Sequence, residues 1–215
     1  ETPVLDDGSL DGEYNYLNIV TDDKGISDVE IGTYKISGNQ VAITTNSYDQ
    51  PIANPPDDTL GPYNITVSGD YISVISTNFN VSLTPKGVMI IDHGANEGMS
   101  VGNKMPPSSY GNDIVGTYFG ITSGGENLVK VEITSAVSIN LYILDEDDGD
   151  LHSLENRSIN ELRPGLYETD LGTIGSTDFG TVRWTMNSQG TFFGIKGQYD
   201  NVPNCEFNVL GLKTD

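Results

Sequence analysis

The chain has 215 residues and a formal net charge of −21, from 31 acidic and only 10 basic side chains. Such a surface repels phosphate backbones, and the Lys and Arg residues are scattered, so we expect neither nucleic acid nor an anionic membrane surface as a partner. No run approaches the roughly 18 apolar residues of a membrane helix, so we expect no transmembrane segment.

The sequence opens with an acidic arm, Glu1–Leu10, that contains Pro and Gly. This composition is typical of a tether between an export or lipid anchor and a folded body. Because the chain starts at Glu1 rather than at Met, we expect a mature protein whose leader has been removed. The expected location is therefore extracytoplasmic, either secreted or anchored at the cell surface.

Segments with β-strand character follow one another through residues 11–106, the first predicted module. They alternate apolar and polar residues or are rich in β-branched and aromatic residues. Short turns such as Ser37-Gly38-Asn39 separate them, and turns of this length join antiparallel neighbours. The predicted strands are Glu13–Val20, Val29–Ile36, Gln40–Thr45, Tyr63–Val67, Tyr71–Ser76, Phe79–Leu83 and Val88–Ile91.

A second series of strands follows a Pro- and Ser-containing linker at residues 107–113 and occupies residues 114–215. The one helical candidate, Leu154–Leu162, is short and stops at Arg163-Pro164-Gly165, which fits a turn better. The predicted strands are Val115–Thr122, Leu128–Thr134, Ile139–Leu144, Leu166–Leu171, Thr181–Met186, Thr191–Ile195 and Glu206–Leu212.

The two series share sequence patterns in the same order. Leu10-Asp-Gly-Glu-Tyr14 has a counterpart in Ile114-Val-Gly-Thr-Tyr118, and the hairpin Val81–Ile91 has one in Val182–Phe193. A repeat of this length is a small domain rather than a solenoid unit. We therefore predict an all-β fold of two tandem, related antiparallel β-meander modules, each a small barrel or sandwich of seven or eight strands.

Residues Gly32–Ile43 read Gly-Thr-Tyr-Lys-Ile-Ser-Gly-Asn-Gln-Val-Ala-Ile, which is two strands joined by a Gly-Asn hairpin, and Tyr63–Val74 repeats the theme. These segments resemble the small lipocalin-like β-barrel modules of bacterial secreted proteins and lipoproteins. The resemblance implies export, a lipid anchor in the lipoprotein members, and a closed meander. It implies no particular ligand.

The densest acidic cluster is Asp145-Glu-Asp-Asp-Gly-Asp150, directly after a predicted strand. Alternating carboxylates in a Gly-containing loop suit Ca²⁺, which takes six to eight oxygen ligands. Asp145, Asp147, Asp148 and Asp150 are therefore candidate Ca²⁺ ligands, although their spacing is not that of an EF-hand loop. The alternative is a solvated turn, and no other cofactor is expected.

A candidate ligand site comes from the aromatic residues of the second series. Trp184 and Phe192 flank one hairpin, and with Tyr118 they could line a pocket for a sugar or a hydrophobic molecule. The neighbouring Arg183 could orient an anionic ligand. The alternative is that these side chains form the core.

Catalytic motifs are missing from the sequence. The hydrolase pattern Gly-x-Ser-x-Gly does not occur, and His93, His152 and Cys205 are too few for a zinc centre. We therefore expect no enzyme activity and no catalytic residues.

The leading hypothesis is a non-catalytic, exported cell-surface protein that binds or scaffolds a small molecule, a glycan or a surface protein. The first alternative is a self-associating extracellular filament or sheath subunit whose arm, Glu1–Leu10, adds to a neighbour's sheet edge. The second alternative is a carbohydrate-active hydrolase, whose paired carboxylates the sequence does not single out.

Overall fold

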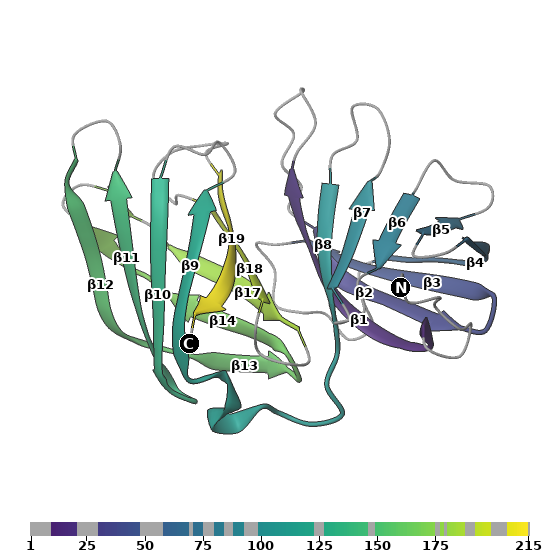
Figure 1. Ribbon diagram of the computed structural model, residues 1–215, viewed down its shortest axis with the longest axis horizontal. Helices are drawn as coiled ribbons and strands as arrows, with labels where there is room; N and C mark the ends of the chain where they lie inside the picture. The colour runs from purple at the N-terminus through teal and green to yellow at the C-terminus, as the bar shows by residue number, and fades with distance from the viewer. Residues whose placement is uncertain are drawn as a thin grey trace. The chain divides into compact units, whose positions relative to one another are not determined.

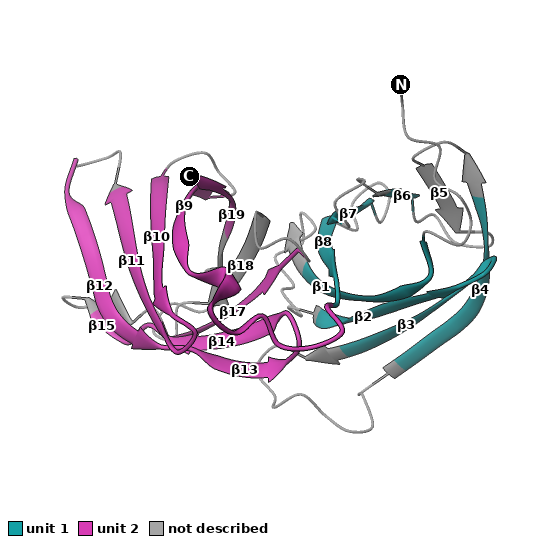
Figure 2. Ribbon diagram, turned by 60° about the horizontal axis from the view of Figure 1, so that its bottom comes forward, with its two compact units in different colours: residues 1–105 teal, residues 106–215 magenta. Residues whose placement is uncertain are grey.

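The computed structural model describes residues 10–20, 30–47, 58–68, 71–74, 80–83, 88–92, 99–122, 127–145, 149–174, 177–178, 180–187, 192–198 and 206–214. The chain divides into two compact units, residues 1–105 and 106–215 (Figure 2). Both units are built from antiparallel strands, which confirms the predicted all-β fold.

The first unit is a closed eight-stranded barrel in which each strand pairs with the next and the last pairs with the first (Figure 1). Its core includes three tyrosines, of which Tyr16 and Tyr34 meet edge to face at 4.8 Å between ring centroids. The strands are β1 (Gly12–Val20), β2 (Glu30–Ser37), β3 (Gln40–Ser47), β4 (Asp58–Ser68), β5 (Tyr71–Val74), β6 (Asn80–Leu83), β7 (Val88–Asp92) and β8 (Met99–Lys104).

The second unit is a nine-stranded sheet in the order β12-β11-β10-β9-β19-β18-β17-β14-β13, with a separate pair of β15 and β16. A short 3₁₀ helix, η1 (Gly111–Ile114), precedes it and overlaps the end of the predicted linker. The strands are β9 (Gly116–Thr122), β10 (Asn127–Ser135), β11 (Ser138–Asp145), β12 (Leu151–Ser158), β13 (Asn160–Arg163), β14 (Leu166–Asp170), β15 (Thr173–Ile174), β16 (Thr177–Asp178), β17 (Thr181–Met186), β18 (Phe192–Gln198) and β19 (Glu206–Thr214).

The edge strands of this sheet, β12 and β13, are consecutive in the chain, with only Ile159 between them. The chain therefore passes from one edge of the sheet to the other at Ile159, and the sheet curls around the buried cluster that contains Trp184, Tyr118 and Tyr167. We call the place where the two edges face each other the seam.

Five strands are not among those predicted from the sequence: β8, β12, β13 and the short pair β15 and β16. The barrel-closing β8 contains Gly102 and Asn103, which have low strand propensity, so no strand was predicted there. The stretch Leu154–Leu162, considered as a helix, lies in β12 and β13. Its alternation is interrupted because Asn156 has a positive φ of 56° and the register with β11 shifts at this point, which marks a β-bulge. The predicted turn at Pro164-Gly165 is present.

In each unit the first strand pairs with the last, and the same side-chain contact, here called the closure contact, joins the two strands. In the first unit the Tyr14 hydroxyl donates to the Leu10 carbonyl at 2.9 Å, and the Lys104 ammonium of β8 lies 5.8 Å from the centre of the Tyr14 ring. A side chain on Gly12 would meet Lys104 Cε at 2.8 Å. This closure contact therefore needs glycine, tyrosine and lysine together.

The second unit repeats the closure contact. The Tyr118 hydroxyl donates to the Ile114 carbonyl at 2.7 Å, and the Lys213 ammonium of β19 lies 5.7 Å from the Tyr118 ring centre. A side chain on Gly116 would meet Lys213 Cε at 2.5 Å. Leu10 and Ile114, which supply the accepting carbonyls, are themselves buried.

Replacing Tyr14 or Tyr118 with Phe removes the donor to a backbone carbonyl but keeps the ring beside the lysine. We expect either variant to lose about 1–2 kcal/mol of unfolding free energy, because the hydrogen bond is buried. Urea denaturation measures this loss. Tyr142→Phe is the matched control, since its hydroxyl bonds to Glu132 only at the surface; an equal loss in the control would contradict the role given to the closure contact.

Burial, and secondly the charge of Asp11, raises the pKa of Tyr14 to about 12. In the unfolded chain this phenol has a pKa of about 10, so its contribution to stability is complete below pH 10 and is lost as the pH rises to about 12. We expect the urea midpoint of the first unit to fall more steeply over this range in the wild type than in Tyr14→Phe. Parallel pH profiles would show that Tyr14 does not carry this dependence.

Candidate functional site

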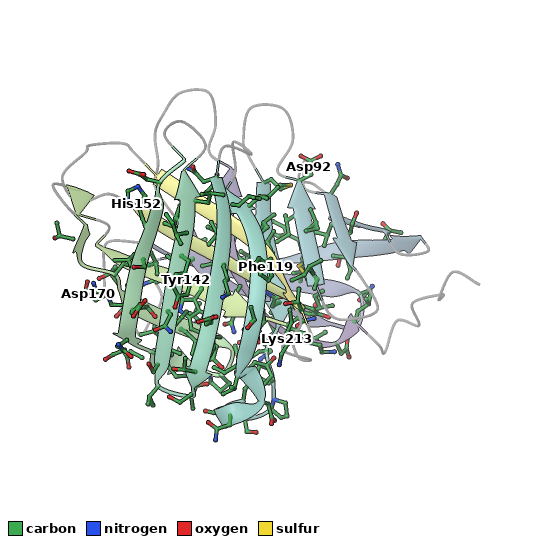
Figure 3. The ribbon with its side chains drawn as sticks, turned by 60° about the vertical axis from the view of Figure 1, so that its left-hand side comes forward. Asp92, Phe119, Tyr142, His152, Asp170 and Lys213 are labelled. Atoms are coloured by element: carbon green, nitrogen blue, oxygen red, sulfur yellow. The ribbon has the colours of Figure 1, made fainter. Side chains whose placement is uncertain are left out.

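Large apolar side chains are exposed on the outer face of β9–β12 and β19 in the second unit. Their exposed fractions lie between 37% and 65%. Figure 3 looks toward these strands, with Phe119 and Tyr142 labelled on them. We call this surface the outer apolar face; it comprises Phe119, Ile121, Leu128, Leu144, Leu151 and Leu212.

Strand register brings these side chains into rows. Leu128 is opposite both Ile121 and Leu144, and Leu144 is opposite Leu151, so one apolar row crosses four neighbouring strands. Phe119 is opposite Leu212 in a second, shorter row. Directly opposite residues share a face of the sheet and touch, so the rows form one continuous surface.

The sequence shows why apolar residues occupy both faces of this sheet. In β10 the inward positions are Val129, Val131 and Ile133, whereas Leu128 points outward. A strand that serves only as a barrel wall alternates apolar and polar residues. Adjacent apolar residues such as Leu128-Val129 and Tyr118-Phe119 are the sequence signal of a strand that is apolar on both faces.

Polar side chains border the apolar rows along β10 and β11. The Lys130 ammonium pairs with Glu132 and lies 5.1 Å from the centre of the Tyr142 ring. The Tyr142 hydroxyl donates to Glu132 at 3.2 Å. These three side chains form a charge-balanced group beside Phe119, to which Lys130 is directly opposite.

A polar pocket of about 390 Å³ lies at the seam. It collects side chains from the two strands on either side of Ile159 and from β14 and β17, and Figure 3 shows Asp170 beside β12. Every residue that lines it is polar. They are residues 156–158 of β12, Asn160 of β13, Glu168 and Asp170 of β14, and Thr181 of β17.

The chain has three arginines, and all of them lie in the second unit. Arg157 is in β12, Arg163 in β13 and Arg183 in β17, and the sequence contains no other arginine. Of these, only Arg157 lines the pocket.

Arg183 is buried and paired. Its Nε donates to Glu168 Oε2 at 3.1 Å, across the register pair of β14 and β17. Glu168 also lines the seam pocket. The residue predicted to orient an anionic ligand therefore contacts the wall of this pocket through Glu168.

Trp184 and Tyr118 lie in the core of the second unit. Trp184 Nε1 donates to Thr169 Oγ1 at 3.2 Å, and its ring stacks on Tyr167 with centroids 4.2 Å apart. Burial raises the pKa of Tyr118 well above its usual range. Both side chains thus have a structural role here, and their part in ligand binding stays a prediction.

The other predicted site residues fall wholly or partly outside the described residues. Phe192 begins β18, opposite Leu212, but its side chain is not described. Asp145 ends β11, Asp147 and Asp148 lie outside the described ranges, and Asp150 is exposed. Within those ranges no group of three His, Cys, Asp or Glu side chains is placed to hold a metal ion. The Ca²⁺ site stays a prediction.

Neither a comparison with family models nor one with curated protein sequences finds a match to the chain. Among solved structures, it is similar to a candidate outer membrane protein from Bacteroides fragilis, with 10% identity, a TM-score of 0.30 and coverage of 97% of this chain and 99% of that one. It is also similar to a mutant of the vaccine antigen transferrin-binding protein B from Actinobacillus pleuropneumoniae, with 9% identity, a TM-score of 0.34 and coverage of 99% and 100%. Both TM-scores are low, so neither likeness bears on function.

The described part of the chain contains no helix long and apolar enough to cross a membrane.

Trp184→Phe removes the donor to Thr169 and part of the ring that stacks on Tyr167. We expect a loss of about 1–3 kcal/mol of unfolding free energy, from the smaller side chain and the unpaired hydroxyl. Urea denaturation measures it, with Phe119→Leu as the control on an exposed aromatic. An unchanged midpoint in Trp184→Phe would show that Trp184 does not support the core.

Proposed function

We propose that this protein is a non-catalytic, exported binding protein that docks a partner protein through the outer apolar face. The observation that carries the proposal is the apolar row across β9–β12. Single exposed apolar side chains are ordinary on soluble proteins, but contiguous apolar patches are typical of interaction sites.

Charge favours one kind of occupant for this face. A second copy of the chain would bring a further net charge of −21, and an anionic membrane would be repelled in the same way. Two exposed acids lie beside the apolar row: Asp150 directly precedes Leu151, and Glu155 lies on β12. The occupant proposed is therefore a protein surface with an apolar centre and a rim of Lys or Arg.

The remaining parts of the proposal rest on the sequence. Export and a cell-surface location are supported by the acidic composition and by the resemblance to secreted β modules. An origin of the two units by duplication is supported by the repeated closure contact. The filament alternative depends on residues 1–9, which lie outside the described residues, and it stays a prediction.

A labelled peptide of alternating Leu and Lys is a defined probe for the outer apolar face. We expect it to bind the full chain and to bind less well when salt screens the charges. The double variant Leu128→Ser/Leu151→Ser removes two members of the row and should weaken binding at least about tenfold, because each leucine buries apolar area worth more than 1 kcal/mol. Fluorescence anisotropy gives both dissociation constants.

Val137→Ser is the matched control, because Val137 is exposed but lies in the β10–β11 turn, away from the row. The proposal fails if the peptide does not bind or binds the double variant equally well. It also fails if light scattering shows that the wild type is a dimer and the double variant a monomer, because the occupant of the face is then a second copy of the chain. Equal binding to neutral phosphatidylcholine vesicles would identify a lipid surface instead.

A further inference from the structure

The seam pocket contains a cation that has no counter-ion among the described residues. Arg157 is half-buried, makes no ion pair with any described residue, and its Nε is enclosed without a hydrogen-bond acceptor. Acidic side chains outnumber basic ones by 31 to 10 in this chain. An unpaired arginine is therefore the exception here and needs an explanation.

Enclosing the Arg157 Nε without an acceptor costs stability. A charged donor removed from water loses solvation, and no described residue supplies an acceptor to this nitrogen. The Arg157 guanidinium lies close to Gly172, where an added Cβ would be 3.2 Å from Nη1. A planar guanidinium can donate to both oxygens of a carboxylate.

The backbone that carries Arg157 is unusual as well. Asn156 has the left-handed conformation, with its N–H donating to Asn140 Oδ1 at 2.8 Å. Asparagine adopts this conformation more readily than other non-glycine residues, although the conformation still has a cost. The β-bulge at Asn156 offsets Arg157 from plain strand alternation and places it in the pocket wall.

The two carboxylates of the pocket are already engaged. Glu168 accepts from Arg183, so its charge is balanced. Asp170 Oδ1 accepts from the Gly172 N–H at 2.9 Å. Both can still accept hydrogen bonds from ligand hydroxyls, because a carboxylate has about four lone-pair sites.

The rest of the lining offers amides and hydroxyls, from Asn156, Asn160, Ser158 and Thr181. These groups both donate and accept, as the hydroxyls of a sugar do. A volume of about 390 Å³ falls within the range of small-molecule sites. The pocket thus matches a ligand that combines one carboxylate with several hydroxyl groups.

We propose that the seam pocket binds a sugar acid, such as a uronic acid unit of an acidic glycan, with its carboxylate on Arg157 and its hydroxyls on the surrounding amides and carboxylates. This site is separate from the outer apolar face, so it stands or falls independently of the proposed docking function.

Three small probes separate the parts of the ligand: glucuronate, glucose and acetate. Titration calorimetry on the full chain should show the tightest binding for glucuronate, with glucose and acetate each at least about tenfold weaker, because each supplies only part of the contacts. Equal binding of acetate and glucuronate would overturn the sugar part of the proposal. The absence of glucuronate binding at millimolar concentration would overturn it entirely.

Arg157→Gln should weaken glucuronate binding at least about tenfold, whereas Lys35→Gln, the same charge change at an exposed site of the first unit, should leave it unchanged. If Arg157→Gln does not fold, Asn160→Asp provides the test. Asn160 is exposed, and a third carboxylate in the pocket should repel the ligand. Glucuronate binding that survives Asn160→Asp, or that survives Arg157→Gln in a folded variant, contradicts the proposal.

Discussion

Pairing of the first strand with the last is the constraint on which each unit depends. A meander built from consecutive hairpins leaves two open edges, and it encloses a core only when those edges meet. In this chain the meeting is made by a tyrosine and a glycine of the first strand and a lysine of the last. The tyrosine hydroxyl donates to a backbone carbonyl four residues earlier, just before the first strand. Because the glycine has no side chain, the lysine of the last strand can pack against it.

The second unit meets the same constraint differently at its seam. Strand β12 bends at the bulge and passes through Ile159 into β13, so a single stretch of chain supplies both edges of the sheet. The buried Leu154 and Ile159 keep the core continuous past the bend. Because the edges do not form a ladder with each other, polar side chains rather than backbone groups fill the space, and the seam pocket with Arg157 results.

Much of the fold was predictable from local patterns, and the candidate functional surfaces were not. Hairpins such as Gly38-Asn39 and strands such as β10 are encoded by turn chemistry and alternation within a few residues. The repeat of Leu10–Tyr14 at Ile114–Tyr118 was visible too, but its lysine partners lie a whole domain away in sequence. Strand β8 was missed because Gly102 and Asn103 become strand residues only through pairing on both sides. The seam pocket depends on topology, and the outer apolar face depends on register, so neither is a property of any single segment.

The meeting of first and last strands also places the two ends of the first barrel side by side. Tyr14 is opposite Lys104, and the Met105 N–H donates to the Glu13 carbonyl at 2.7 Å. A folding unit whose entry and exit points coincide can be inserted into a surface loop of another protein, or copied in series, without stretching either partner. The same adjacency permits circular permutation, since the old ends can be joined by a short linker and new ones opened at the Gly38-Asn39 turn. The barrel can thus be moved between chain contexts, because its structure depends on the closed ring of strand pairs and not on where the chain begins.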